Sequence, residues 1–193
     1  MAIAGLTQEA AAIEQPGFEV AEEIGDLEIR RYEQQIVART LVGSSFKEAG
    51  NEGFRRLAGY IFGNNDLDQK IAMTAPVRLT AAPQERAKED EQFWVIFSMP
   101  SEYEFDELPQ PDDTRVQVET MPIRYMAVLP YRGNWSEKRY RKHEAKLLSL
   151  LEDVSSWRIT GEATWARYDP PFMPGFMRSN EVAIEVVPIV EGQ

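Results

Sequence analysis

Residues 70–80 read Lys-Ile-Ala-Met-Thr-Ala-Pro-Val-Arg-Leu-Thr, and this stretch decides the fold of the chain. Every second residue from Ile71 to Leu79 is apolar, whereas the residues between them are small, polar or charged. A period of two is typical of a β-strand with one buried face. Pro76 has no N–H to donate to a strand ladder, so we expect an edge, a bulge or a break in pairing there.

Short alternating segments separated by turn residues predict further strands on both sides of this stretch. The first three follow one another closely and favour an antiparallel meander. Residues 93–100 are apolar on both faces, which indicates a central strand. We expect strands over residues 18–23, 27–33, 36–42 and 93–100, and then over residues 116–119, 123–131, 161–168 and 181–187.

Two helices interrupt these strands. Ser45 and Glu48 have the spacing of a capping box, which satisfies two free backbone N–H groups at the start of the first helix. Its end is predicted at Gly63-Asn64-Asn65, because glycine and asparagine tolerate the left-handed conformation that stops a helix. The second helix is expected over residues 135–151, with Asn134 or Ser136 as its cap.

The order strand-strand-helix-strand-strand therefore occurs twice, over about residues 17–100 and 114–190. Each half would leave one sheet face bare, and the economical solution is a shared core. We expect a single domain over residues 17–190, a split or distorted antiparallel β-barrel of the α+β class flanked by two helices. Residues 1–16, which end at Pro16 before Gly17, are expected to form a flexible N-terminal arm.

The composition excludes several classes of function. The chain has 193 residues, 32 acidic and 21 basic, and a formal charge of −11, which disfavours nucleic acid and anionic lipid as partners. It has no cysteine, which excludes disulfides, thiolate catalysis and cysteine-ligated haem. No segment approaches the roughly 20 apolar residues of a membrane span. We therefore expect no transmembrane segment and a cytoplasmic, soluble protein.

Residues 71–77, Ile-Ala-Met-Thr-Ala-Pro-Val, resemble the signature of the SOUL haem-binding protein family. Four further landmarks of that family follow the same order along the chain. The resemblance implies a distorted eight-stranded barrel built from two repeats with two long helices, related to the bacterial GyrI-like small-molecule-binding domains. The landmarks are residues 27–33, residues 53–65, residues 97–101 with 108–109, and residues 168–172 with 178–182.

The resemblance implies a shallow hydrophobic groove beside the first helix that binds haem or another tetrapyrrole. A porphyrin needs a flat apolar slot, cations for its two propionates and, if ligated, an axial donor. One axial histidine proposed for the family precedes the tyrosine of the early strand, and that position here is Arg31. We therefore expect haem without histidine ligation. His143, the only histidine, is interpreted as a partly buried helix residue and not as a metal ligand.

The candidate binding residues lie on the first helix and on the signature stretch. Two arginines can pair with propionates, since guanidinium groups make directional bonds to carboxylates; the other interpretation is a solvated helix face. The apolar candidates would contact the porphyrin or belong to the core, and Met73 would be a soft axial ligand or a packing residue. The candidates are Phe54, Arg55, Arg56, Leu57, Ala58, Ile61 and Met73.

The sequence contains no GxGxxG or GxxxxGK[ST] motif and no zinc-type ligand spacing, so we expect neither an enzyme nor a metal site. The leading hypothesis is a protein that carries or buffers haem reversibly. Two alternatives remain: a GyrI-like sensor of amphipathic small molecules, and a protein-interaction module. The second alternative would use the loop over residues 170–177, in which Phe172 and Phe176 accompany two methionines, three prolines and a glycine, as a partner surface or lid.

Overall fold

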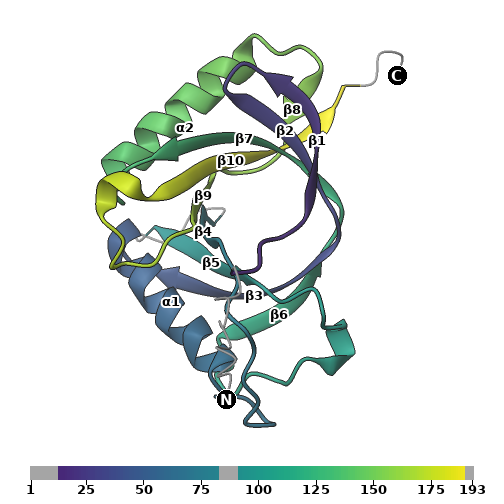
Figure 1. Cartoon of the computed structure of the whole chain (residues 1–193), viewed down its shortest axis with the longest axis vertical. Coiled ribbons are helices and arrows are strands. Elements are labelled where there is room, and N and C mark those ends of the chain that lie inside the picture. Colours follow the sequence, from purple (N-terminus) through teal and green to yellow (C-terminus); the bar gives the residue numbers. More distant parts are fainter. Residues whose placement is uncertain (1–12, 83–90, 190–193) are drawn as a thin grey trace, which may run out of the picture.

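The computed structural model describes residues 13–82 and 91–189. They form one antiparallel sheet of ten strands and two α-helices, which confirms the α+β class (Figure 1). The elements in chain order are β1 (Phe18–Ile24), β2 (Leu27–Tyr32), β3 (Gln35–Gly43), α1 (Phe46–Ile61), β4 (Val77–Ala81), β5 (Gln92–Ser98), β6 (Val116–Met121), β7 (Arg124–Arg132), α2 (Glu137–Glu152), β8 (Trp157–Ile159), β9 (Thr164–Arg167) and β10 (Ser179–Pro188), with single 3-10 turns over Phe105–Glu107 and Gly175–Met177.

The order of the strands shows how the two halves are related. The sheet runs β1-β2-β7-β10-β9-β4-β5-β3-β6, and β8 pairs with β10 outside this path. The strands β2, β3, β4 and β5 of the first half correspond to β6, β7, β9 and β10 of the second half, in that order. If each strand is exchanged with its counterpart, the strand order from β2 to β6 is reversed, and every pair of neighbouring strands is again a pair of neighbours. Eight strands thus obey a two-fold relation, as the family resemblance implies, and β1 and β8 are additions to it. The sheet curls without any pairing of β1 to β6 in the described residues.

The first strand of each repeat, β2 or β6, pairs with a strand of the other half. β2 pairs with β7 and also with β1, and β6 pairs with β3. The expected meander of the first three strands is therefore wrong beyond the β1–β2 hairpin, because β3 pairs with β5 and β6 and not with β2. Sequence proximity favours local pairing, but the free edge of β2 is taken by β7 from the second half.

The signature stretch forms a strand only in its second part. β4 begins at Val77, directly after Pro76, and the Ala75–Pro76 peptide bond is cis. Before it, the chain is held by single contacts: the Thr74 hydroxyl donates to the Ser98 carbonyl at 2.7 Å. The predicted break at the proline is confirmed, whereas the predicted strand over the residues before it is not.

Both helices begin and end near their predicted positions. The Ser136 hydroxyl accepts from the Arg139 N–H at 3.3 Å and caps α2. In α1 the Ser45 hydroxyl instead donates to the Glu48 carboxylate at 3.0 Å and caps no backbone N–H. The expected capping box is therefore replaced by a hydrogen bond to a charged acceptor, which is stronger than one to a neutral group. In the described residues no helix is long and apolar enough to cross a membrane.

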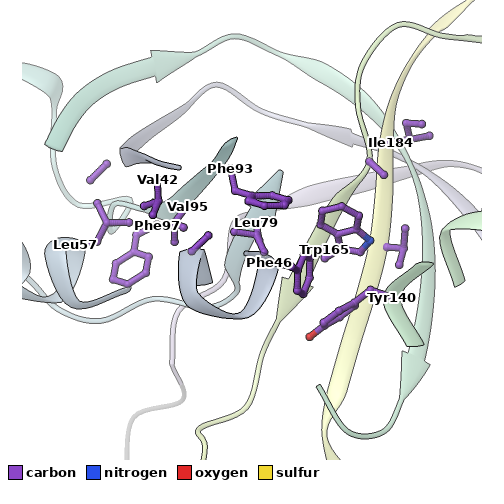
Figure 2. Packing of buried hydrophobic residues seen from close by; sticks show 14 of the residues in the cluster. Val42, Phe46, Leu57, Leu79, Phe93, Val95, Phe97, Tyr140, Trp165 and Ile184 are labelled. Atoms are coloured by element: carbon purple, nitrogen blue, oxygen red, sulfur yellow. The ribbon is translucent and has the colours of Figure 1, made fainter. Parts of the chain in front are cut away.

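The core lies between the helices and the outer face of the sheet. α1 packs on β3 and β5, and α2 packs on β7 and β10, on the same side of the curl (Figure 1). Phe46 at the start of α1 stands at the centre of an aromatic cluster, with its ring 5.1 Å from Trp165 and 5.4 Å from Tyr140 (Figure 2). These two partners belong to the second half, so the core is continuous across the two-fold.

Candidate functional site

An apolar groove runs along the exposed flank of α1, opposite the segment that follows β9. Its cavity volume is about 490 Å³. One wall is α1, a second is the signature stretch before and at the start of β4, and a third is the segment between β9 and β10. The lining residues are Ile13, Gly50, Asn51, Phe54, Arg55, Met73, Thr74, Ala75, Val77, Trp135, Arg167, Tyr168, Asp169, Pro170 and Pro171.

The α1 wall follows from helical geometry. Gly50, Asn51, Phe54 and Arg55 are spaced at i, i+1, i+4 and i+5, which places them on one flank of the helix. Phe54 is 38% exposed, and its ring meets the buried ring of Phe97 nearly edge-on at 5.5 Å. The core therefore fixes one side of Phe54 and leaves the other side open to the groove.

Arg167 at the end of β9 brings a positive charge to the floor of the groove. Its Nε donates to the Tyr140 hydroxyl at 3.1 Å, and its guanidinium lies 5.2 Å from the centre of the Trp135 ring. A β-carbon on Gly50 would lie 3.4 Å from the Arg167 Nη1, so the glycine gives this guanidinium room against α1. Within residues 13–82 and 91–189 no carboxylate oxygen lies within 4.0 Å of Arg167.

The outer rim of the groove is an apolar loop held by Arg178. The Arg178 Nε donates to the Met173 carbonyl at 2.9 Å, a second N–H donates to the Pro171 carbonyl, and the guanidinium lies 4.1 Å from the centre of the Trp135 ring. These contacts fix the backbone of the loop. They leave the side chain of Phe172 87% exposed and that of Phe176 76% exposed.

Comparison with known proteins shows where this arrangement belongs. The model of the family described as SOUL heme-binding protein matches residues 13–185. The chain belongs to this family. Heme-binding protein 1 of Xenopus laevis is 32% identical over 156 residues, covering 80% of each chain. Heme-binding protein 2 of Homo sapiens is 29% identical over 156 residues, covering 77% of this chain and 76% of the relative.

Solved structures with this architecture are distant in sequence. The C-terminal domain of EcmrR has a TM-score of 0.61 at 10% identity, and the match covers 84% of this chain and 98% of the EcmrR domain. A hydrolase from Listeria innocua has a TM-score of 0.56 at 10% identity, and the match covers 83% of this chain and 91% of the hydrolase chain. At such identities the likeness establishes a shared fold and nothing about activity. This chain thus shares its fold with the EcmrR C-terminal domain and with the Listeria innocua hydrolase.

The seven candidate binding residues of the SOUL chain separate into two groups. Phe54, Arg55 and Met73 line the groove. Leu57, Ala58 and Ile61 do not: their exposed fractions are 0%, 8% and 1%, and they pack toward the sheet. These three residues follow Phe54 by three, four and seven positions and therefore lie within about 60° of it around the helix axis. The groove ends at the turn of Phe54 because the later turns of this stripe are buried, and not because they lie on another flank.

Arg56, the seventh candidate, faces away from the groove. Its guanidinium donates to the Leu41 carbonyl at 3.0 Å and the Thr40 hydroxyl at 3.2 Å, and pairs with Glu52. It lines a different, polar cavity of about 300 Å³. Arg55 lines this polar cavity as well, but of the two adjacent arginines only Arg55 also lines the apolar groove.

His143 lies on α2, away from the groove. Its ring stacks on Tyr131 with 3.8 Å between centroids and 12° between planes, and its Nδ1 lies 2.8 Å from the Arg139 carbonyl oxygen. The neighbours on α2 and β7 thus occupy one ring face and one ring nitrogen. In the described part of the chain no group of three His, Cys, Asp or Glu residues is placed to hold a metal ion.

Sequence reasoning missed Trp135 and Arg167 as groove residues. Both come from the second half of the chain: Arg167 ends β9, which pairs with β4, and Trp135 lies against the Arg167 guanidinium. No local pattern marks either residue. The prolines and aromatic residues of the loop over residues 170–177 mark it in the sequence as a partner surface or lid, and its first two prolines line the groove.

Proposed function

We propose that the α1 groove binds haem or another tetrapyrrole reversibly and without covalent attachment, so that the protein carries or buffers its ligand and catalyses no reaction. Membership of the SOUL heme-binding protein family and the names of its relatives support the ligand class. The single structural observation that carries the proposal is an apolar groove bordered by two arginines, Arg55 and Arg167.

The residues of the groove meet the demands of a flat, anionic ligand. Phe54, Met73, Val77 and Trp135 offer apolar surface, and a volume of about 490 Å³ lies within the range of roughly 300–1,000 Å³ usual for small-molecule sites. Arg55 and Arg167 would pair with propionates through directional, charge-assisted hydrogen bonds. Haem would supply an iron centre, and these side chains would bind and orient the porphyrin that carries it.

The groove also suits reversible binding. It has no histidine among its lining residues, and Met73 packs against the core, so we propose that apolar contact and propionate pairing dominate over iron ligation. The exposed rings of Phe172 and Phe176 on the adjoining loop would cover a bound porphyrin partly and leave a route for release. The same exposed rings favour the second candidate function, a surface for a protein partner.

A hemin titration followed by visible absorption tests the proposal. Phe54→Glu places a charge in the apolar wall, and we expect the Kd to rise at least about tenfold, equivalent to about 1.4 kcal/mol. The matched control is Phe62→Glu, because Phe62 also belongs to the α1 region, is 61% exposed and lies outside the groove. Equal affinity of wild type and Phe54→Glu would exclude the groove.

Variants of Arg55 and His143 extend the hemin titration. Arg55→Glu should weaken hemin binding, whereas Lys47→Glu, the same charge change at an exposed α1 position outside the groove, should not. His143→Ala should leave the absorption spectrum of the complex unchanged, because stacking and hydrogen bonding already engage the ring. Loss of a sharp Soret band in His143→Ala would make His143 the axial ligand.

A further inference from the structure

A second cavity lies on the concave face of the sheet, the face that the helices do not cover. Residues alternate along each strand between the two faces. Leu79, Val95 and Trp165 therefore lie in the core. The residues next to them along the strands, such as Arg78 and Trp94, line a cavity of about 220 Å³ on the other face. Its walls come from β1 to β7, β9 and β10, so both halves of the molecule build it.

Two arginines in this cavity, Arg78 and Arg124, make no ion pair within the described residues. Arg78 on β4 and Arg124 on β7 each have an Nε that is shielded from solvent and has no hydrogen-bond partner. No carboxylate oxygen of residues 13–82 and 91–189 lies within 4.0 Å of either guanidinium. Within the described residues, Arg78 Nη2 donates to the Ser98 hydroxyl at 3.1 Å, and Arg124 Nη1 donates to the Met121 sulfur at 2.8 Å.

The proximity of the two arginines has an electrostatic cost. Burial, and then the charge of Arg124, lower the pKa of Arg78 to about 9. Burial also lowers the pKa of Arg124, against the opposing effect of Glu185. Both remain cationic at neutral pH, and partly buried like charges are unfavourable unless a counter-charge meets them. An anion between them would remove that cost.

The other ionised groups of the cavity are partly committed elsewhere. Arg39 pairs with Glu119 at 2.8 Å and lies 4.1 Å from the centre of the Trp94 ring. Glu181 accepts from Arg30 at 2.9 Å and from the Tyr168 hydroxyl. Glu162 and Glu185 also line the cavity. Among the cationic side chains that line the cavity, Arg78 and Arg124 are therefore the two with no carboxylate of the described residues within 4.0 Å.

Gln35 is a third polar side chain of this cavity that has no hydrogen-bond partner. Both the Oε1 and the Nε2 of Gln35 are shielded from solvent and unpartnered, and Gln35 lines this cavity. Buried polar atoms in native proteins are nearly always hydrogen-bonded, so each such atom needs an explanation. The Nε groups of the two guanidinium groups and the Nε2 of Gln35 are thus three unsatisfied donors around one cavity.

We infer that the concave cavity is a second binding site, separate from the α1 groove, for a small organic carboxylate. Its carboxylate bridges Arg78 and Arg124, the Gln35 amide donates to it, and its apolar body lies against Trp94, Ile96 and Met126. The volume of about 220 Å³ lies below the usual range of drug-sized pockets, which restricts the ligand to a small molecule and excludes a porphyrin.

Methionine methyl groups distinguish the two sites in one experiment. Met121 and Met126 line the concave cavity, and Met73 lines the α1 groove. Full-length protein labelled with ¹³C at the methionine methyls is titrated with benzoate, phenylacetate and cyclohexanecarboxylate, and with their uncharged amides. We expect at least one carboxylate to shift the Met121 and Met126 signals saturably and to leave Met73 unmoved, and its amide to bind at least tenfold more weakly.

Variants locate the interaction. Arg78→Gln and Arg124→Gln should each weaken binding of that carboxylate at least tenfold, and Arg141→Gln, on α2 and outside the cavity, should not. Ligand-free Arg78→Gln should also keep or raise the Tm of the wild type, because it removes one of two repelling charges; this separates a binding residue from a merely structural one. The inference is overturned if no carboxylate of the set shifts Met121 and Met126, if the amides bind equally well, or if Arg78→Gln binds as wild type.

Discussion

At Gly53, α1 lies close against β5. A β-carbon at this position would lie 2.3 Å from Val95 Cγ2 and 2.5 Å from Val95 Cβ, well inside any real contact. Gly53→Ala should therefore lower the free energy of unfolding by about 2 kcal/mol: overpacking costs up to about 3 kcal/mol, and the better helix propensity of alanine returns about 1 kcal/mol. Chemical denaturation measures the change.

Two further variants make this result specific. Gly17→Ala is the control, since nothing lies within 4 Å of a β-carbon there, and its stability should equal that of the wild type. Adding Val95→Ala to Gly53→Ala makes room for the new methyl group, so the double variant should lose less than the sum of the two single changes. Unchanged stability of Gly53→Ala would show that α1 can move away from β5.

Asp113 and Arg115 form the ion pair with the clearest pH signature. Arg115 donates to the Asp113 carboxylate from its side chain at 2.7 and 2.9 Å and from its backbone N–H at 3.0 Å, and this lowers the pKa of Asp113 to about 2. A lowered folded-state pKa stabilises the protein above the unfolded value near 3.8, and that stabilisation disappears as the pH falls toward about 2. For an exposed pair it amounts to at most about 1 kcal/mol.

Carboxyl ¹³C NMR titration tests this assignment. In Arg115→Gln the pKa of Asp113 should rise toward its ordinary value of 3.8, because the largest cause of the shift has been removed. Arg141→Gln removes a different surface cation and should leave the titration of Asp113 unchanged. An Asp113 pKa near 3.8 in the wild type would contradict the hydrogen-bond geometry.

At the scale of the element, α1 shows what local sequence reveals. Its boundaries followed from the spacing of Phe46, Ala49, Gly53 and Leu57 and from the glycine after its end, because helix formation depends on nearby residues. Which of its residues face a ligand depends on distant parts of the chain. Phe54 and Ile61 are both apolar and lie on nearly the same side of the helix, two turns apart, yet only Phe54 borders the groove, because Ile61 is buried and Phe54 is partly exposed.

The loop over residues 170–177 depends on one cation. Arg178 binds two of its carbonyls and lies over Trp135, and Ser179 N–H donates to Asp169 at 2.6 Å at the loop's base. Arg178→Ala should therefore speed amide hydrogen exchange within the loop while the exchange of β7 and β10 stays as in wild type. Hydrogen-exchange mass spectrometry measures this, with Arg141→Ala as control. Equal exchange in both variants would show that the prolines alone fix the loop.

At the scale of the whole molecule, the two repeats were predictable and their interlocking was not. Alternation and turn residues located the main strands, because each strand is a local pattern. Pairing between β2 and β7 or between β4 and β9 joins segments far apart in sequence and is determined by burial of the shared core. The concave cavity depends on the same pairing, since Arg78 and Arg124 come from different halves.

This interlocking predicts that neither half folds alone. A cut between residues 112 and 113 keeps the connector with α1, where the Tyr60 hydroxyl donates to the Pro109 carbonyl at 2.9 Å. Residues 1–112 then lose β7 from β2 and β9 from β4, and residues 113–193 lose β3 from β6. Phe46 is also parted from Trp165 and Tyr140 in the centre of the core.

Each fragment should therefore lack dispersed amide signals and a cooperative thermal transition, whereas the intact chain should unfold in one step. Exposed strand edges and an open apolar face make an isolated half unstable. Mixing the two fragments at equal concentration should restore the spectrum of the intact protein, because the missing edges are then supplied in trans. A dispersed spectrum and a sigmoidal melt from residues 1–112 alone would mean that the first half has a sufficient core of its own, and that the seam between β4 and β9 joins two units instead of completing one.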